Sequence, residues 1–448
     1  MADDAGNIDE THDPEARSWV DSANDPATDF PIQNLPFALL LEPDADRGHF
    51  GVVIGDRLFA LHNVLEVEAE AGLEWAYAAD AVMRMSRAER TKLRGLIFEL
   101  LNADASAADR AMVAGDVIAV TADHRWQVPF PVENYTDFYA SIHHASTVGS
   151  MFRPDNPLLP NYKWVPIGYH GRASSITMTD TPIVRPFGQT KADDAAAPTF
   201  GPCKMLDHEL EVGVVIAGEN DMGDPVGISR ARERMLGLTL VNDWSARDVQ
   251  KWEYQPLGPF LAKNFATTVG SVVVSMEALE PFRCPAYRRP DGDPRPLPHL
   301  FDETDQSRGG FDITLEVRLQ SAKMAAAKMP AVVLSRSNAF KDMYWTFAQM
   351  IAHHTSNGCN LLPGDLLASG TVSGPESTSR GCMLELTWDG STPDGKPKPR
   401  KPITLPTGES RTFLADGDTV ELVGWCEKPG FKRIGFGSCS GTIAAARA

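Results

Sequence analysis

The sequence predicts a mainly β protein that also contains some α-helix. Short runs rich in valine, leucine and isoleucine recur along the chain, and turn-forming residues separate them, which is typical of strands. Helical periodicity is confined to a few stretches, and the segments 281–303 and 388–406 carry too much proline for element interiors. The composition is 43% hydrophobic and 23% charged over 448 residues, which suits two or three globular domains.

The N-terminal third is expected to form a small β-rich domain over residues 17–130, after an acidic, disordered tail at residues 1–16. Segments 37–42 and 49–63 are strand-like, and Gly55-Asp56 is expected to close a hairpin. Ser86 and Glu89 have the spacing of a capping box before an apolar stripe, which predicts a helix over 87–102.

Residues 131–448 are expected to form a larger, mixed and mainly β domain. Its predicted strands lie at 210–217, 235–243, 269–276, 311–320, 382–388 and 418–426. Its predicted helices lie chiefly at 245–254 and 343–356.

The overall charge narrows the classes of partner. A formal net charge of -18 disfavours broad attraction to nucleic acid or to an anionic membrane surface, and an anionic ligand would need local positive groups or a metal. The six cysteines are widely spaced and form no CxxC pair, which favours reduced thiols over a disulfide framework. Because no apolar run reaches about 18 residues and the N-terminus is acidic, we expect a soluble cytoplasmic protein.

The segment 206–215 reads LDHELEVGVV, and strand alternation places Asp207, Glu209 and Glu211 on one side. Stacked carboxylates repel one another, so this side either faces solvent or binds a cation. Asp243, at the end of a predicted strand, and Asp137 could complete a cation site. A set of three or four carboxylates without cysteine suits a hard cation such as Mg²⁺ or Ca²⁺.

The predicted helix 245–254 places three polar side chains on one face, because Arg247, Gln250 and Tyr254 follow an i, i+3, i+7 spacing. A cation, an amide and a phenol together can bind an oxyanion, although an ordinary solvated face would look the same. Lys263 lies in a mostly apolar segment, where a buried lysine needs a partner.

Two adjacent histidines, His143 and His144, cannot point in one direction, so one is expected to pack or to lie at the surface. The other could serve as a general base, although a lone histidine is more often structural. Glu385 lies between two leucines of a predicted strand and could orient such a histidine, or simply face solvent. The glycine-rich segment 435–441 has the wrong spacing for GxGxxG, and too few residues follow it for a βαβ unit.

Several long motifs closely resemble those of the fumarylacetoacetase (fumarylacetoacetate hydrolase) family. They include DFYASIHHASTVGSMFR at 137–153, KMLDHELEVG at 204–213, VNDWSARDVQKWEYQPLGPFLAKNF at 241–265 and RIGFGSCSGTI at 433–443. The likeness runs from about residue 17 to the C-terminus. It implies an N-terminal SH3-like barrel, a C-terminal mixed β-roll, a homodimer and a diketo dicarboxylate substrate. The implied reaction is hydrolysis of 4-fumarylacetoacetate to fumarate and acetoacetate, the last step of tyrosine and phenylalanine degradation.

The resemblance also implies a role for each matching residue. It implies that Mg²⁺ or Ca²⁺ is held by Asp137, Glu209, Glu211 and Asp243, and that a second cation site would use Asp243, Lys263 and Thr267. It implies that His144 is the general base, that Glu385 orients it, and that Arg247, Gln250 and Lys263 stabilise the oxyanion. The implied substrate contacts are Tyr139, Arg153, Tyr169, Gln250, Tyr254 and Thr371.

Two other functions fit the same motifs less closely. One is an acylpyruvate hydrolase or a 2-oxo acid decarboxylase of the same superfamily, although such relatives are generally shorter and lack the N-terminal domain. The other is a non-catalytic metal-binding β protein, in which the polar face of helix 245–254 would be mere surface.

Overall fold

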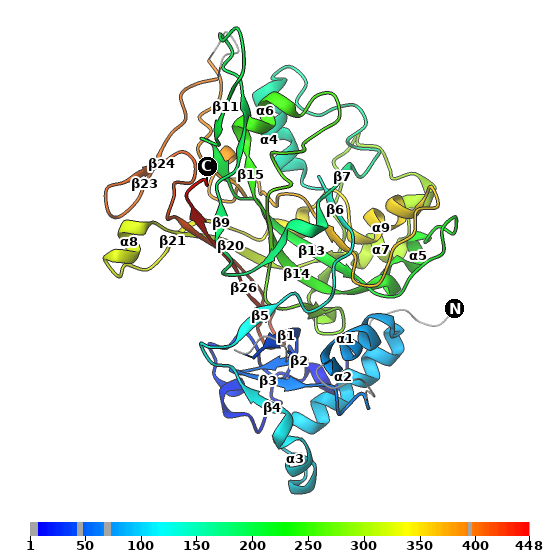
Figure 1. Ribbon diagram of the computed structural model, residues 1–448. Coiled ribbons are helices and arrows are strands. Elements are labelled where there is room, and N and C mark those ends of the chain that lie inside the picture. Colours follow the sequence, from blue (N-terminus) through cyan, green and yellow to red (C-terminus); the bar gives the residue numbers. More distant parts are fainter. Residues whose placement is uncertain (1–7, 43–47, 67–72, 393–396, 448) are drawn as a thin grey trace.

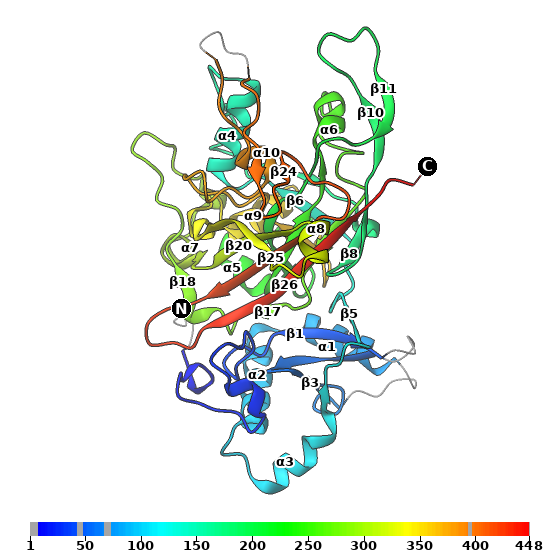
Figure 2. The same ribbon diagram turned by 90° about the vertical axis from the view of Figure 1, so that its left-hand side faces the viewer.

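Three larger sheets organise the chain. The computed structural model describes residues 8–42, 48–66, 73–392 and 397–447. The N-terminal part lies to one side of the larger C-terminal part, which carries the other two sheets (Figures 1 and 2). Strands outnumber helices among the described elements, which confirms the mainly β prediction.

The N-terminal sheet is antiparallel and has the strand order β4-β3-β2-β1-β5. Its strands are β1 (Phe37–Leu41), β2 (Gly48–Ile54), β3 (Arg57–Ala60), β4 (Val117–Ala119) and β5 (Arg125–Gln127). The helices of this part are α1 (Glu74–Arg84), α2 (Arg87–Leu101) and α3 (Ala107–Val113). In the described residues β4 and β5 are the two edges, so closure into an SH3-like barrel remains a prediction.

Helix α2 begins as its sequence predicts. Ser86 Oγ accepts the Glu89 N–H at 3.3 Å, and Glu89 Oε2 accepts the Ser86 N–H at 2.7 Å, which together make a capping box. The apolar stripe of this helix is buried at Leu93, Ile97 and Leu101. The predicted helix 87–102 is therefore confirmed.

The prediction of disorder over residues 1–16 is wrong for the described part of that tail. Residues 1–7 lie outside the described residues, but Glu10–His12 form a short 3₁₀ helix that Asp9 caps. Thr11 is buried, and its hydroxyl accepts from Arg94 Nε at 2.9 Å. The ring of His12 lies 2.9 Å from the Glu277 carbonyl oxygen. Pairing with distant groups, which local composition does not reveal, orders this segment.

The largest sheet has eight strands and the order β7-β6-β22-β13-β14-β16-β8, with β17 beside β14. Its strands are β6 (Tyr135–Phe138), β7 (Gly168–His170), β8 (Ile176–Met178), β13 (Leu210–Ile216), β14 (Met235–Asp243), β16 (Thr267–Val269), β17 (Val274–Ser275) and β22 (Leu366–Ala368). The second C-terminal sheet has the order β21-β20-β25-β26-β9. Its strands are β9 (Ile183–Val184), β20 (Thr314–Gln320), β21 (Val332–Ser337), β25 (Thr419–Cys426) and β26 (Ile434–Ala444).

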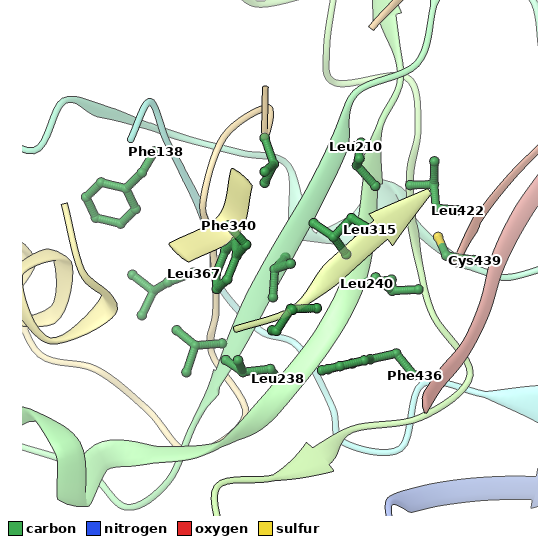
Figure 3. Packing of buried hydrophobic residues seen from close by; sticks show 14 of the residues in the cluster. Phe138, Leu210, Leu238, Leu240, Leu315, Phe340, Leu367, Leu422, Phe436 and Cys439 are labelled. Atoms are coloured by element: carbon green, nitrogen blue, oxygen red, sulfur yellow. The ribbon is translucent and has the colours of Figure 1, made fainter. Parts of the chain in front are cut away.

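The two C-terminal sheets pack face to face over one hydrophobic core. Leu238 and Leu240 of β14 lie near Leu315 of β20 and Leu422 of β25, and Phe436 of β26 closes the same layer (Figure 3). These five side chains are essentially inaccessible to solvent. This packing fixes β14, and with it the residues at the end of that strand.

Smaller elements surround these sheets. The remaining strands are β10 (Phe187–Thr190), β11 (Thr199–Pro202), β12 (Leu206–Asp207), β15 (Ser245–Ala246), β18 (Arg283–Cys284), β19 (Gly310–Phe311), β23 (Ile403–Thr404) and β24 (Ser410–Arg411). The remaining helices are α4 (Ile142–Phe152), α5 (Ile228–Ala231), α6 (Arg247–Glu253), α7 (Glu303–Arg308), α8 (Ala322–Ala326), α9 (Phe347–Thr355) and α10 (Met383–Leu386). The β10–β11 hairpin projects from the body beside α6 (Figures 1 and 2).

Three local predictions differ from the structure. The segment 382–388 was expected as a strand, but Glu385 lies in the short helix α10. The predicted helix 245–254 begins only at Arg247, because Ser245 and Ala246 pair with β12. The expected strand 269–276 is divided between β16 and β17, with residues 270–273 between them. Contacts with distant segments decide all three.

The N-terminal and C-terminal parts share buried side chains. Phe37 and Val273 exchange two backbone hydrogen bonds of 2.9 Å. Phe37 also belongs to a hydrophobic cluster that includes Leu366 of the largest sheet. Among the described residues, no helix combines the length and the apolar character that a membrane crossing requires.

Candidate active site

Four carboxylates meet at one end of the largest sheet. Asp137 lies on β6, Glu209 and Glu211 flank the start of β13, and Asp243 ends β14. Each offers an oxygen, and these four oxygens all lie within 4.8 Å of one another. Each of these four residues is at most 5% exposed. The alternative of a solvent-facing strand side is therefore wrong, and the sequence-predicted acids converge.

The electrostatics of this acidic cluster, defined as Asp137, Glu209, Glu211 and Asp243, favour a cation. Both carboxylate oxygens of Glu211 and Oδ1 of Asp137 find no hydrogen-bond partner among the described residues. Burial, together with the neighbouring carboxylates, raises the pKa values of Glu211 and Asp137 well above their usual range. Buried oxygens without donors suit a hard dication, so the residues present fit Mg²⁺ or Ca²⁺.

Lys263 is the nearest positive group of the cluster. Its Nζ donates to Asp243 Oδ2 at 2.6 Å and also to Glu209 Oε2. Burial opposes the charge of Lys263, but Asp243 and Glu209 outweigh it and raise the pKa of this ammonium. Thr267 Oγ1 donates to Asp243 Oδ1 at 2.9 Å. Lys263 is thus a charge partner of the acids, and a second cation site at Lys263 and Thr267 remains a prediction.

Arg247, the first residue of α6, lies between two carboxylates. Its Nε donates to Asp207 Oδ2 at 2.9 Å, and its Nη2 lies 2.8 Å from Glu209 Oε1 as an ion pair. Its Nη1 donates to Gln250 Oε1 at 3.2 Å, as the i, i+3 spacing predicts. Because Gln250 accepts through its oxygen, its amide N–H groups are directed elsewhere. Tyr254 follows at the C-terminal cap of the helix.

His144, rather than His143, is the histidine that faces a carboxylate. Its Nδ1 lies 2.7 Å from Glu385 Oε2, and both side chains are buried. Ser141 begins α4 by accepting the His144 N–H at 3.2 Å, which fixes the backbone of that histidine. His143 is half-buried, and burial lowers its pKa. Surface exposure of Glu385, the alternative considered from the sequence, is wrong.

Several groups hold the Glu385 carboxylate in its anionic form. Ser373 Oγ donates to Oε2 at 2.6 Å, Cys382 Sγ lies 3.4 Å from the same oxygen, and Arg380 Nη1 lies 3.6 Å from Oε1. Burial alone would raise the pKa of Glu385, but His144 and Ser373 lower it below its usual value. An anionic Glu385 only accepts, so His144 Nδ1 carries a proton and Nε2 is left as the basic atom.

The residues expected to contact substrate lie around these two groups. The Tyr139 ring packs edge-on against the imidazole of His144, with 5.3 Å between ring centroids. The Tyr169 hydroxyl lies 2.7 Å from Asp243 Oδ2 and 3.0 Å from Asp137 Oδ2. Thr371 is buried, and its hydroxyl has no partner within the described chain. Arg153 Nη2 donates to the Pro157 carbonyl oxygen at 3.1 Å.

Asp207 and Ser373 are site residues that the sequence reasoning missed. Asp207 was counted with the stacked acids, but its carboxylate accepts from Arg247, Met383 and Leu384 instead of joining the acidic cluster. The chain leaves regular strand geometry between β12 and β13, so alternation does not carry through this segment. No sequence signal marks Ser373, which lies in a loop.

A known protein family matches the part of the chain that carries this site. The family model described as "Fumarylacetoacetate (FAA) hydrolase C-terminal" matches residues 133–444, a stretch that contains every site residue described above. The chain belongs to the fumarylacetoacetate hydrolase family.

Relatives within this family match almost the whole chain. The fumarylacetoacetases of Bos taurus and Homo sapiens are each 43% identical to it over 437 residues, covering 96% of this chain and 99% of the relative. The fumarylacetoacetase of Caenorhabditis elegans is 44% identical over 429 residues, covering 94% of this chain and 97% of the relative. The family likeness therefore includes the N-terminal part.

Proposed function

We propose that this protein hydrolyses the carbon–carbon bond of 4-fumarylacetoacetate, giving fumarate and acetoacetate. The observation that carries the proposal is the contact between Arg247 and Glu209. Through this contact the acidic cluster binds Arg247, the first residue of α6. Arg247 also pairs with Asp207, and Asp207 binds the helix that carries Glu385. Buried side chains thus link the acidic cluster to the pair of His144 and Glu385. The 40–44% identity to curated fumarylacetoacetases over nearly the full length supports this substrate.

The acids Asp137, Glu209, Glu211 and Asp243 would hold a divalent ion, and we propose Mg²⁺ or Ca²⁺ because all four ligands are hard carboxylates. Bound there, such an ion supplies Lewis-acid stabilisation of the enolate that leaves when the carbon–carbon bond breaks. Two of the three N–H groups of Lys263 go to Glu209 and Asp243 in the described structure. We assign the third to substrate oxygen.

His144 is assigned as the general base. Its Nε2 takes a proton from water, and the water oxygen then attacks the carbonyl carbon of the substrate. The anionic Glu385 holds the Nδ1 proton and stabilises the imidazolium that forms. The carbon–carbon bond then breaks with its electron pair on the acetoacetate carbon, which regains a proton from the imidazolium. Water therefore supplies the oxygen of the new carboxylate and the proton of the new C–H bond.

Arg247, Gln250 and Lys263 are assigned to the tetrahedral oxyanion. Removal of one such donor typically costs about 3–4 kcal/mol of transition-state stabilisation. Tyr139, Arg153, Tyr169, Tyr254 and Thr371 are assigned to substrate binding. Arg153 supplies local positive charge for a substrate carboxylate in a chain whose formal net charge is -18.

We also propose a homodimer in the cytoplasm. The end of α6 and the segment after it expose large apolar side chains: Trp252 is 44%, Leu257 97%, Phe260 67% and Leu261 47% exposed. A second copy of this chain would cover these residues, since several large exposed apolar side chains in one short segment are typical of an interaction site. The six cysteines are free, which suits a reducing compartment.

The test is an assay of the purified protein on fumarylacetoacetate, with and without added Mg²⁺ or Ca²⁺, followed by the loss of diketone absorbance. We expect turnover that depends on the divalent ion and yields fumarate. Acylpyruvates are assayed in parallel. Turnover of acylpyruvates with none of fumarylacetoacetate would replace the proposed substrate.

A further inference from the structure

We infer that Asp207 is a positioning residue that sets the distance between the general base and the oxyanion donors. Asp207 is completely buried, and each of its carboxylate oxygens accepts two hydrogen bonds. Oδ1 accepts the N–H groups of Met383 at 2.7 Å and His208 at 2.9 Å. Oδ2 accepts the Leu384 N–H at 3.0 Å and Arg247 Nε at 2.9 Å.

On one side, Asp207 anchors the helix that carries Glu385. Helix α10 spans only Met383–Leu386, and its own N-cap residue, Cys382, makes no capping hydrogen bond through its side chain. Asp207, from a segment about 175 residues earlier in the chain, receives the first two N–H groups of the helix in its place. Glu385 is the next residue, so the place of its carboxylate beside His144 depends on this anchor.

On the other side, the same carboxylate holds Arg247. The guanidinium bridges Asp207 and Glu209, and Glu209 belongs to the acidic cluster. Asp207 therefore touches both the oxyanion-binding arginine and the helix that orients the base, while its own carboxylate lies outside the acidic cluster. An error of about 1 Å between such groups can cost on the order of 100-fold in rate.

An asparagine cannot replace this carboxylate. Its amide NH₂ would replace either Oδ1, facing the N–H groups of Met383 and His208, or Oδ2, facing the Leu384 N–H and Arg247 Nε–H. In either orientation donors would meet donors in a buried place. In Asp207→Asn we expect α10 and Arg247 to shift. Turnover should fall by about 10–100-fold, as for other residues that support catalytic groups, while KM changes little.

The matched control is Asp418→Asn. Asp418 is also completely buried and is also held by an arginine and a backbone N–H, through Arg411 Nε at 2.8 Å and the Ala415 N–H at 2.8 Å. This variant measures how much stability is lost when one buried carboxylate that pairs with an arginine is removed. We expect Asp418→Asn to lower the melting temperature while kcat stays near the wild-type value.

The kinetic test of this inference rests on the proposed function. A second measurement needs no substrate, so its outcome does not depend on that function. In magnesium-loaded protein, the His144 Nδ1 proton held by Glu385 should give a downfield ¹H NMR resonance, assigned by its absence in His144→Gln. We expect Asp207→Asn to lose or shift this resonance and Asp418→Asn to retain it. If Asp207→Asn gives no cooperative melt, Asp207→Ser, which keeps one acceptor for α10, is measured instead. An unchanged resonance, or a kcat equal to that of Asp418→Asn, would overturn the inference.

Discussion

His144 Nδ1 lies 2.7 Å from Glu385 Oε2, although 241 residues separate the two in the chain. No short sequence motif links the two residues. Ser141 at the start of α4 fixes the histidine, and Ser373 donates to the carboxylate oxygen that faces it. The pair thus has a defined proton on one ring nitrogen and a basic atom on the other.

The first prediction uses the two adjacent histidines as a matched pair. His144→Ala should lower kcat by about 10²–10⁴-fold, because a positioned general base contributes that much. His143→Ala removes the same chemical group one residue away and should leave most of the activity. Loss of diketone absorbance measures both. Near-wild-type turnover of His144→Ala would exclude it as the base.

The second prediction concerns the ion. Chelation with EDTA should abolish turnover, and Mg²⁺ or Ca²⁺ should restore it. Glu211→Gln should weaken binding of the ion in calorimetric titration, because it removes a carboxylate ligand whose oxygens have no donor among the described residues. At 100 times its Kd the ion should stabilise the wild-type fold by about 2.7 kcal/mol.

A control for the ion is Glu316→Gln. Glu316 is equally buried but pairs with Arg318 at 2.6 Å and also with Arg336. Its loss should affect stability and leave the Kd of the ion unchanged. Full activity after exhaustive chelation would show that the four acids serve another purpose.

Sequence reasoning succeeded where a residue's partners lie nearby in the chain or where the alternation is long. The capping box of Ser86 and Glu89 is local, and the apolar runs of β13 and β14 are long enough to predict a strand in each. The resemblance to a known family then selected the acids and His144. The burial of all four acids follows from the sheets, whose strand order is a long-range property.

Predictions failed where a distant group decides local structure. Alternating leucines around Glu385 suggested a strand, but Asp207 anchors the segment as the helix α10. Asp207 itself leaves the stack of acids because its donors come from α6 and α10. Likewise, the acidic tail contains Thr11, which is ordered by Arg94 on α2. None of these pairings is visible from residues a few positions away.

The third prediction concerns the dimer. In light-scattering measurements the wild-type chain should have twice the mass of one chain, and Leu257→Ser/Phe260→Ser should dissociate it. The matched control is Met222→Ser, which changes a side chain that is 83% exposed on another loop. The loop that carries Leu257 connects Gln250 to Lys263, and Glu253 Oε1 holds it through the Phe260 N–H at 2.9 Å. Dissociation should therefore also lower turnover. An unchanged mass in the double variant would place the interface elsewhere.

The fourth prediction gives a pH dependence of stability. Asp305 is buried, and the Thr346 hydroxyl lies 3.0 Å from each oxygen of its carboxylate. Burial raises the pKa of Asp305 to about 6. The unfolded chain has a value near 4, so the folded state holds this proton more tightly. The resulting stabilisation is complete below pH of about 4 and is lost as pH rises through about 6.

The difference between a pKa of about 6 in the folded protein and about 4 in the unfolded chain corresponds to roughly 3 kcal/mol of stability, which urea unfolding at a series of pH values can resolve. Asp305→Asn carries no titratable proton, so its free energy of unfolding should lose this slope between about pH 4 and 6. Asp302 is the N-cap residue of α7, and its Oδ1 accepts the Asp305 N–H at 3.0 Å. The variant Asp302→Asn changes this neighbouring carboxylate and should retain the slope. Identical pH profiles for wild type and Asp305→Asn would show that Asp305 does not bind its proton more tightly in the folded protein.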